Sequence, residues 1–308
     1  MKRNVILLVL AALLLTAILA FSACGGDSGT EASKTPEATE SLKNNTEEPP
    51  TEKPSAEPTE EPTAEPTEEP TEKPTETSDP TEVPDGLPIA DIFSAVIDAN
   101  GITDGSANKY KVEELNEPKT KYDESIGRYV AAFDGGDKET AGTYVVMDFV
   151  NSYNALEKSF SAEVYCSYNA LELEMYCMGN LHAAGFGIGM ANDGDNTTLG
   201  ALFRNGDNYE IVEFGETKAE TYYHCVITFD GKSMSYYFDG KLVGTKEITD
   251  FYMTDVDGAQ YLAIGADCSE DQQNEYFYDG NVAIVNIYST ALTAEQVTAL
   301  YNALPVKK

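Results

Sequence analysis

The stretch HCVITFDGKSMSYYFDGKLVG, residues 224–244, decides the fold class of this chain. Its first part alternates, so that Cys225, Ile227 and Phe229 share one face of a predicted strand. The Asp-Gly pairs at 230 and 239 are turn signals, because both residue types tolerate positive φ. The pattern therefore predicts consecutive antiparallel strands joined by tight turns, with these three side chains in the core between two sheets.

Other short alternating runs surround this stretch and are separated by glycine and aspartate turns. Many short strands at such spacing predict an all-β, two-sheet antiparallel sandwich. One short C-terminal helix is predicted after Thr293, because TAEQ has the spacing of a capping box, and Pro305 ends it. The predicted strands are residues 129–133, 143–149, 159–168, 170–177, 185–189, 222–229, 234–238, 242–245, 261–265 and 281–288.

Two further motifs follow the 224–244 stretch, YLAIGAD at 261–267 and YDGNVAIVNIYSTALTAEQVTALY at 278–301. In this order the three motifs resemble the central hairpin, the next strand and the closing segment of laminin-G-like domains. The resemblance covers roughly residues 128–304 and implies a concanavalin A-like jelly roll. We interpret residues 87–127 as the leading strand region of the same domain, which gives a single domain at 87–308.

The first 23 residues are typical of a bacterial lipoprotein signal peptide. Lys2 and Arg3 precede an apolar run, and the small residues before Cys24 resemble a lipobox, with Phe21 where leucine is usual. In a lipobox the cysteine receives a diacylglyceryl group and the chain is cut before it. The alternative is a transmembrane anchor, but the run is shorter than the roughly 20 residues that spanning needs. We therefore expect lipidation of Cys24 and attachment to the extracellular face of the cell membrane.

Residues 24–86 are expected to form a disordered, acidic Thr/Glu/Pro-rich stalk. From Gly25 to Gly86 there are 18 acidic and 4 basic residues, and proline recurs every four positions from Pro50 to Pro74. Such a segment buries too little apolar surface to offset the entropy of ordering it. Regular prolines favour an extended polyproline II conformation, so the stalk is either a spacer or a passive linker.

The domain at 87–308 is acidic as well, with 35 acidic and 14 basic residues out of the 53 and 20 in the whole chain. This charge argues against nucleic-acid partners and anionic lipid surfaces, which need clusters of Lys and Arg. It is compatible with neutral ligands, cations or basic partners.

Four cysteines follow Cys24, namely Cys166, Cys177, Cys225 and Cys268. None forms a CxxC pair, so their spacing does not support zinc. Two alternatives stay open for them, disulfides in an exported protein or small buried hydrophobes.

Glu172 and Glu174 are the candidates for glycosidase chemistry, because glucanases of the same broad fold use paired strand carboxylates. Retaining hydrolysis needs two carboxyl groups about 5 Å apart, and the next residue on this face is Tyr176. The chain has no tryptophan for sugar stacking. We therefore expect a solvated strand face and no catalytic residues.

Neither of the two histidines is expected to be catalytic. His224 stands at a position where laminin-G-like domains keep a packing histidine, and His182 lies beside a glycine-rich segment without the context of a nucleotide site. The resemblance also implies a possible calcium site at Asp134 and Asp137, although Ala283 replaces an acidic ligand of the family. We therefore expect no cofactor beyond a possible structural Ca²⁺.

Exposed tyrosines suit stacking on a glycan or contact with a protein, although strand propensity alone also explains their number. The candidate ligand contacts are Tyr209, Asp193 and Asp267. The resulting hypothesis is a non-catalytic, lipid-anchored surface module that binds an extracellular glycan or a surface protein. The alternatives are a glucanase-like, glycan-active enzyme of the same fold and a structural partner of another exported enzyme.

Overall fold

The computed structural model describes residues 86–170, 175–181, 185–193, 196–253, 260–268 and 274–305, without the side chains of 191–197. The expected signal peptide, the lipidation residue Cys24 and the stalk up to residue 85 lie outside these residues. Glu172, Glu174 and His182 lie outside them too. Within the described part, no helix is long and apolar enough to cross a membrane.

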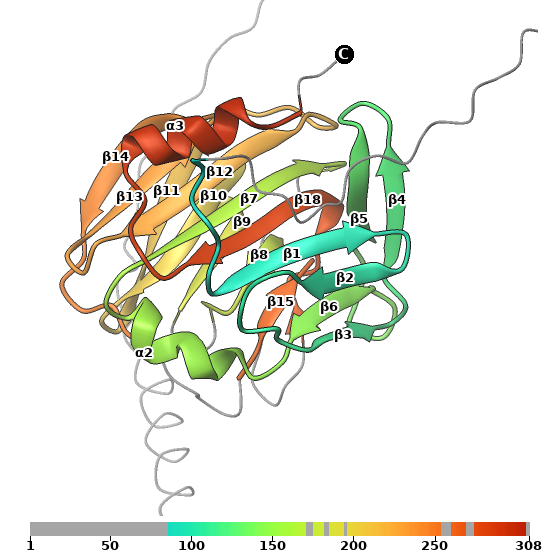
Figure 1. Cartoon of the computed structure of the whole chain (residues 1–308), viewed down its shortest axis with the longest axis horizontal. Helices are drawn as coiled ribbons and strands as arrows, with labels where there is room; N and C mark the ends of the chain where they lie inside the picture. The colour runs from blue at the N-terminus through green and yellow to red at the C-terminus, as the bar shows by residue number, and fades with distance from the viewer. Residues whose placement is uncertain are drawn as a thin grey trace, which may run out of the picture. The chain divides into compact units, whose positions relative to one another are not determined.

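Among these residues, nine strands form the larger of the two main antiparallel sheets. Figure 1 shows three of its strands, β7, β18 and β1, side by side. Strands β1 and β18 pair near the start and end of the domain, with Phe93 opposite Ile287. The strands within residues 87–127 therefore belong to the same two sheets. In spatial order the sheet contains β14 (Lys241–Glu247), β13 (Ser233–Phe238), β12 (Tyr223–Phe229), β7 (Phe160–Tyr168), β18 (Asp279–Tyr288), β1 (Phe93–Asp98) and β2 (Gly101–Asp104), with β5 (Arg128–Asp134) on β18 and β4 (Lys119–Asp123) on β5.

The second sheet has seven strands among the described residues and faces the first across the core. A two-stranded ribbon of β16 (Asp267–Cys268) and β17 (Asn274–Glu275) accompanies it. Two such sheets confirm the predicted jelly-roll sandwich. In spatial order the strands are β11 (Asn208–Gly215), β10 (Asn196–Asn205), β9 (Phe186–Asp193), β8 (Tyr176–Gly179), β15 (Leu262–Ile264), β6 (Thr143–Val146) and β3 (Val112–Leu115).

The core between the sheets follows the predicted alternation. Cys225, Ile227 and Phe229 are all buried in the main apolar cluster, as their shared face requires. Phe160 of β7 and Phe186 of β9 stack across the two sheets with ring centroids 4.6 Å apart. Burial of such aromatic pairs is the main apolar contribution to holding the sheets together.

The predicted tight turn between β13 and β14 is confirmed by its backbone angles. Asp239 and Gly240 have φ of 47° and 74°, the left-handed region that a two-residue hairpin turn requires. This turn places Asp239 beside β12, where its carboxylate accepts a hydrogen bond from the backbone N–H of His224 at 3.0 Å.

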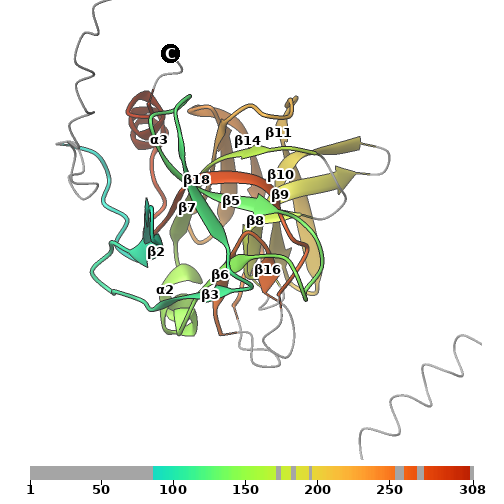
Figure 2. The same cartoon turned by 90° about the vertical axis from the view of Figure 1, so that its right-hand side faces the viewer.

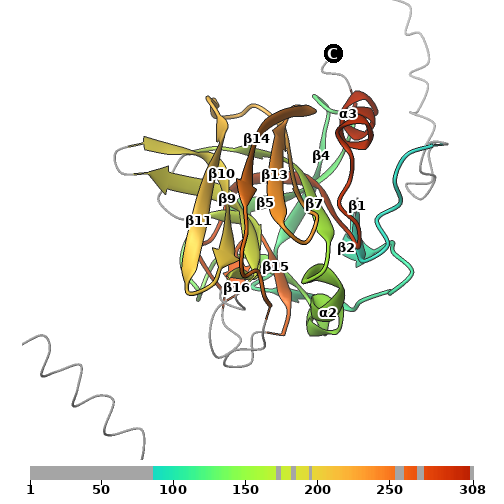
Figure 3. The ribbon, with the colours of Figure 1, turned by 90° about the vertical axis from the view of Figure 1, so that its left-hand side faces the viewer.

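Helix α3 (Ala294–Asn302) confirms the predicted C-terminal helix and its capping box. Thr293 Oγ1 accepts from the backbone N–H of Gln296, and the Gln296 side chain accepts from the backbone N–H of Thr293. Val297 and Leu300 of α3 pack with Val226 of β12 on the outer face of the nine-stranded sheet. Figures 2 and 3 show α3 on the side of this sheet away from β9, β10 and β11.

Several predicted boundaries were wrong or incomplete. The strand predicted at 143–149 ends at Val146, because Asp148 has φ of 58° and starts a 3-10 turn η1 (Phe149–Ser152) followed by α2 (Tyr153–Leu156). Of the strand predicted at 170–177, only Tyr176 and Cys177 belong to β8 among the described residues. Strands β10 and β11 were not predicted.

Candidate functional site

A tyrosine-lined pocket lies on the outer face of the nine-stranded sheet, where β7 and β12 meet the end of α3. Its cavity of about 410 Å³ is within the range of roughly 300–1,000 Å³ typical of small-molecule sites. The sheet provides its floor and the C-terminal residues provide one wall. The lining residues are Tyr165, Thr221, Tyr222, Tyr223, Asp239, Tyr301, Asn302, Leu304 and Pro305.

The rings of the pocket are held in fixed positions. The Tyr165 and Tyr222 rings lie 5.2 Å apart, and the Tyr222 hydroxyl donates to Asp123 Oδ2 at 2.7 Å. Burial raises the pKa of Tyr165 to about 12, and burial followed by the bond to Asp123 raises the pKa of Tyr222 as well. Both phenols therefore stay protonated and neutral at physiological pH. Tyr301 is 38% exposed and presents its ring at the rim.

A buried hydrogen-bond network supports this pocket from below. His224 Nε2 lies 2.9 Å from Glu163 Oε1, and the His224 ring lies 5.9 Å from that of Tyr301. Glu163 Oε2 accepts from the Tyr288 hydroxyl at 2.6 Å and from Asn286 Nδ2 at 2.9 Å. The interpretation of His224 as a hydrogen-bonded packing residue is confirmed.

The charge of Glu163 is maintained by these bonds. Burial by itself would raise the pKa of Glu163, but the hydrogen bonds from His224, Tyr288 and Asn286 and the attraction of His224 outweigh it and lower that pKa. Glu163 and His224 are 1% and 0% exposed. Neither side chain lines the tyrosine-lined pocket, so we assign this pair the role of holding Tyr301 and the surrounding strands in position.

A family model described as the concanavalin A-like lectin/glucanases superfamily matches residues 139–298, which is more than half of the chain. The chain belongs to this superfamily. The match contains β7 and β12 and most of α3, and therefore most of the tyrosine-lined pocket. A search of curated protein sequences found no significant match.

Solved structures of the same concanavalin A-like fold include binding domains of botulinum neurotoxins. The type C neurotoxin structure, described by its interaction with two ganglioside molecules, has a TM-score of 0.54 at 15% identity and covers 70% of this chain. The neurotoxin DC binding domain with rat synaptotagmin II has a TM-score of 0.52 at 14% identity, and the same domain with SialylT has 0.52 at 15%, both again covering 70% of this chain. This chain spans 51% of each of these chains, and identities so low show the fold alone.

Two of the predicted ligand contacts of this concanavalin A-like domain lie close together. Tyr209 is 41% exposed, and its hydroxyl donates to the backbone oxygen of Leu181 at 3.3 Å, while the backbone N–H of Leu181 donates to Asp267 Oδ1 at 2.8 Å. Asp267 is completely buried, so its carboxylate binds the backbone N–H of Leu181 and has no contact with solvent. Asp193 pairs with Asn196 at the other end of the β9–β10 ladder, and its side chain lies outside the described residues.

Tyr209 also packs on the guanidinium of Arg204, which lies between two tyrosine rings. The Arg204 Cζ atom is 4.8 Å from the Tyr209 ring centroid and 5.5 Å from that of Tyr252. This cation–π stack occupies one face of the Tyr209 ring and leaves its other parts exposed. Neither Tyr209 nor Asp267 lines the tyrosine-lined pocket, so the structure separates these predicted contacts from it.

The two calcium candidates are occupied by protein partners. Asp134 Oδ2 accepts from Lys119 Nζ at 3.0 Å, and Asp137 Oδ1 accepts from Thr140 Oγ1 at 2.7 Å and from the backbone N–H of Glu139 at 3.2 Å. Calcium takes six to eight oxygen ligands. Among the described residues, no group of three or more His, Cys, Asp or Glu side chains is arranged to hold a metal ion. The residues around this turn therefore do not fit a calcium site.

The four cysteines of the domain have free thiols and are all buried. The Cys177 thiol donates to the backbone oxygen of Ile188 at 2.9 Å inside the core. Of the two alternatives that the sequence left open, the structure agrees with small buried hydrophobes.

The sequence pointed to exposed tyrosines as a class but gave no reason to group Tyr165, Tyr222 and Tyr223 in one site. Tyr301 and Asp239 were missed as pocket residues, because their place depends on how α3 and the β13–β14 turn pack on β12. A usable signal was present in Glu163, a charged residue inside the otherwise uncharged strand FSAEVYCSY.

Proposed function

We propose that this chain is a non-catalytic surface module whose concanavalin A-like domain binds a glycan in the tyrosine-lined pocket. The observation that supports this best is the pocket itself. The Tyr301 ring, 38% exposed at the rim, offers a stacking face, while Asp239 and Asn302 add polar groups for sugar hydroxyls. The similar neurotoxin domains, described with gangliosides and with SialylT, agree with a glycan as the ligand class.

The proposal includes attachment to the extracellular face of the membrane through lipidated Cys24, with residues 24–86 as the spacer. The domain has 35 acidic and 14 basic residues. This charge disfavours nucleic acid as a partner, and it favours a ligand that is uncharged or that is bound through a few local contacts. A surface protein is the alternative ligand, since one neurotoxin domain is in complex with rat synaptotagmin II.

Replacing Tyr301 by alanine is expected to weaken glycan binding about fivefold, because one stacking ring contributes on the order of 1 kcal/mol. The mature chain would first be screened on a glycan array, and the affinity for the best ligand would then be measured by calorimetry. Tyr122→Ala is the matched control, because Tyr122 is 52% exposed on β4 and does not line the pocket. Equal losses in both variants, or none in Tyr301→Ala, would contradict this location of the site.

No polysaccharide is expected to be hydrolysed by this chain, although the superfamily description includes glucanases. The measurement is release of reducing sugar from a panel of polysaccharides by the wild type and by the Glu172→Gln, Glu174→Gln double variant. The sequence alternation groups these two carboxylates with Tyr176 as the next residue, and so predicts no opposed second carboxyl of the kind that hydrolysis needs. Activity that disappears in the double variant would replace the binding-module proposal by the glucanase-like alternative.

A further inference from the structure

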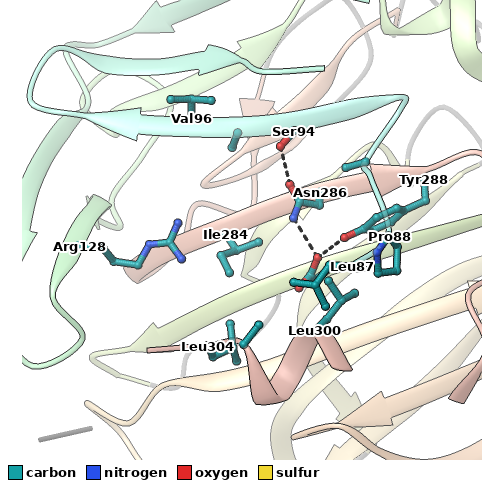
Figure 4. Close-up of a pocket in the computed structure, with 14 residues that line it drawn as sticks. Leu87, Pro88, Ser94, Val96, Arg128, Ile284, Asn286, Tyr288, Leu300 and Leu304 are labelled. Atoms are coloured by element: carbon teal, nitrogen blue, oxygen red, sulfur yellow. Dashed lines mark hydrogen bonds between the residues drawn. The ribbon is translucent and has the colours of Figure 1, made fainter. Parts of the chain in front are cut away.

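A second cavity, of about 270 Å³, lies on the same face of the nine-stranded sheet, between β1, β18, β5 and α3 (Figure 4). Leu304 lines both this cavity and the tyrosine-lined pocket, so the two are neighbours. Its size is slightly below the range of drug-sized sites, which suits one small group such as a single sugar ring. Leu87, Val96, Ile284 and Leu300 provide its apolar walls.

Arg128 extends from the start of β5 into this cavity, and Figure 4 shows its guanidinium directed toward Ile284. The side chain is half-buried and makes no hydrogen bond or ion pair with any residue that the structure describes. Burial lowers the pKa of the Arg128 guanidinium, with the charge of Glu163 opposing the effect, but arginine stays protonated in proteins. A partly desolvated cation with five free donors is costly unless a partner satisfies it.

The other polar groups of the cavity are already paired. Ser94 Oγ donates to Asn286 Oδ1 at 2.9 Å, and Asn286 in turn donates to Glu163, whose two oxygens both have partners. Glu163 is therefore not an ion-pair partner of Arg128. Among the residues that the structure describes, no carboxylate forms an ion pair with the guanidinium in this cavity, although the domain has 35 acidic residues.

We propose that Arg128 binds the carboxylate of an acidic sugar, so that the ligand of this domain is a glycan containing a sugar acid. A carboxylate matches the guanidinium by two parallel N–H···O bonds, which gives both strength and orientation. The exposed Tyr301 ring of the neighbouring pocket favours a sugar over a simple organic acid, because it offers stacking for the adjoining residue of the glycan. The inference rests on the proposed glycan-binding function and adds the class of sugar.

The test follows the Arg128 side-chain Nε–H signal by NMR in the full chain, with glucuronate, glucose and acetate as probes. Glucuronate is expected to shift this signal saturably, glucose to leave it unchanged, and acetate to bind more weakly. Arg128→Gln should lower the affinity for glucuronate at least about tenfold. The affinity of Arg128→Lys should lie between those of the wild type and Arg128→Gln, because lysine keeps the charge but loses the bidentate geometry. Lys119→Gln is the matched control, because Lys119 is an exposed cation on the neighbouring strand β4.

Equal binding of glucuronate and glucose, or no effect of Arg128→Gln, would overturn the inference. Acetate binding as tight as that of glucuronate would overturn the assignment to a sugar acid. Failure of the proposed function looks different, because Tyr301→Ala would then leave the binding of every array glycan unchanged. If Tyr301→Ala weakens glycan binding and Arg128→Gln does not, the glycan-binding function stands and the carboxylate site is rejected.

Discussion

Replacing Glu163 by alanine is expected to lower the free energy of unfolding by about 3–5 kcal/mol. The variant would leave three donors without an acceptor, on the buried His224 and Tyr288 and on the partly buried Asn286. His224 and Tyr288 have lost their contact with water on folding, so their unmade bonds retain the desolvation cost. Urea denaturation followed by circular dichroism measures the effect.

The matched control for this variant is Glu210→Ala, which removes a more exposed ion pair of similar length. Glu210 Oε2 lies 2.7 Å from Lys246 Nζ, and the two side chains are 30% and 41% exposed. Ion pairs in contact with solvent contribute little, so this variant should change stability by at most about 1 kcal/mol. Equal losses in the two variants would contradict the view that Glu163 acts through burial and its network.

The Glu163 contribution should also depend on pH in a defined direction. The folded-state pKa of Glu163 is lowered below the ordinary value of 4.5, so its stabilisation is present above that pH and is lost as the pH falls through the folded-state pKa. The stability difference between the wild type and Glu163→Gln is therefore expected to narrow below about pH 4.5. A difference that stays constant down to pH 3 would contradict a charged, hydrogen-bonded Glu163.

The sandwich was predictable where alternation and turn chemistry act over short distances. The run from Cys225 to Phe229 faces the core because side chains of a strand alternate, and the turn at Asp239 needs only its two residues to accept positive φ. Strand β11 was missed because Glu210 lies on the same face as the buried Val212 and Phe214, which breaks the apolar alternation, and because the strand lies at a sheet edge with little burial. Its pairing with β10 also shifts register at Gly200, which interrupts the pattern.

The candidate site was less predictable, because it depends on what covers the outer face of a strand. Alternation in β7 assigns Phe160 and Val164 to the core and Glu163 and Tyr165 to the opposite face, which the sequence suggests is open to water. Helix α3, more than 120 residues later in the chain, covers that face, and a second apolar cluster forms between the helix and the sheet. Tertiary packing of this kind leaves no local signal other than an isolated charge in an apolar strand.

Replacing Cys24 by alanine is expected to abolish lipid attachment completely. A diacylglyceryl group is joined through the cysteine sulfur, which alanine lacks, and the four other cysteines, at 166, 177, 225 and 268, are buried in the domain. Loss of both acyl chains would remove the apolar surface that anchors the protein, because about 0.8 kcal/mol is contributed by each buried CH₂ group. The mature domain should then be released from the cell surface or mislocalised.

Metabolic labelling with an alkyne fatty acid, followed by purification of the chain, gives the direct measurement. Ser28→Ala is the control, since it changes a neighbouring residue and keeps the Cys24 thiol. Fractionation alone is insufficient, because an uncleaved precursor would remain in the membrane through its apolar segment from Val5 to Phe21. Label that persists on the Cys24→Ala chain would show that another residue carries the lipid, and the proposed anchor would be rejected.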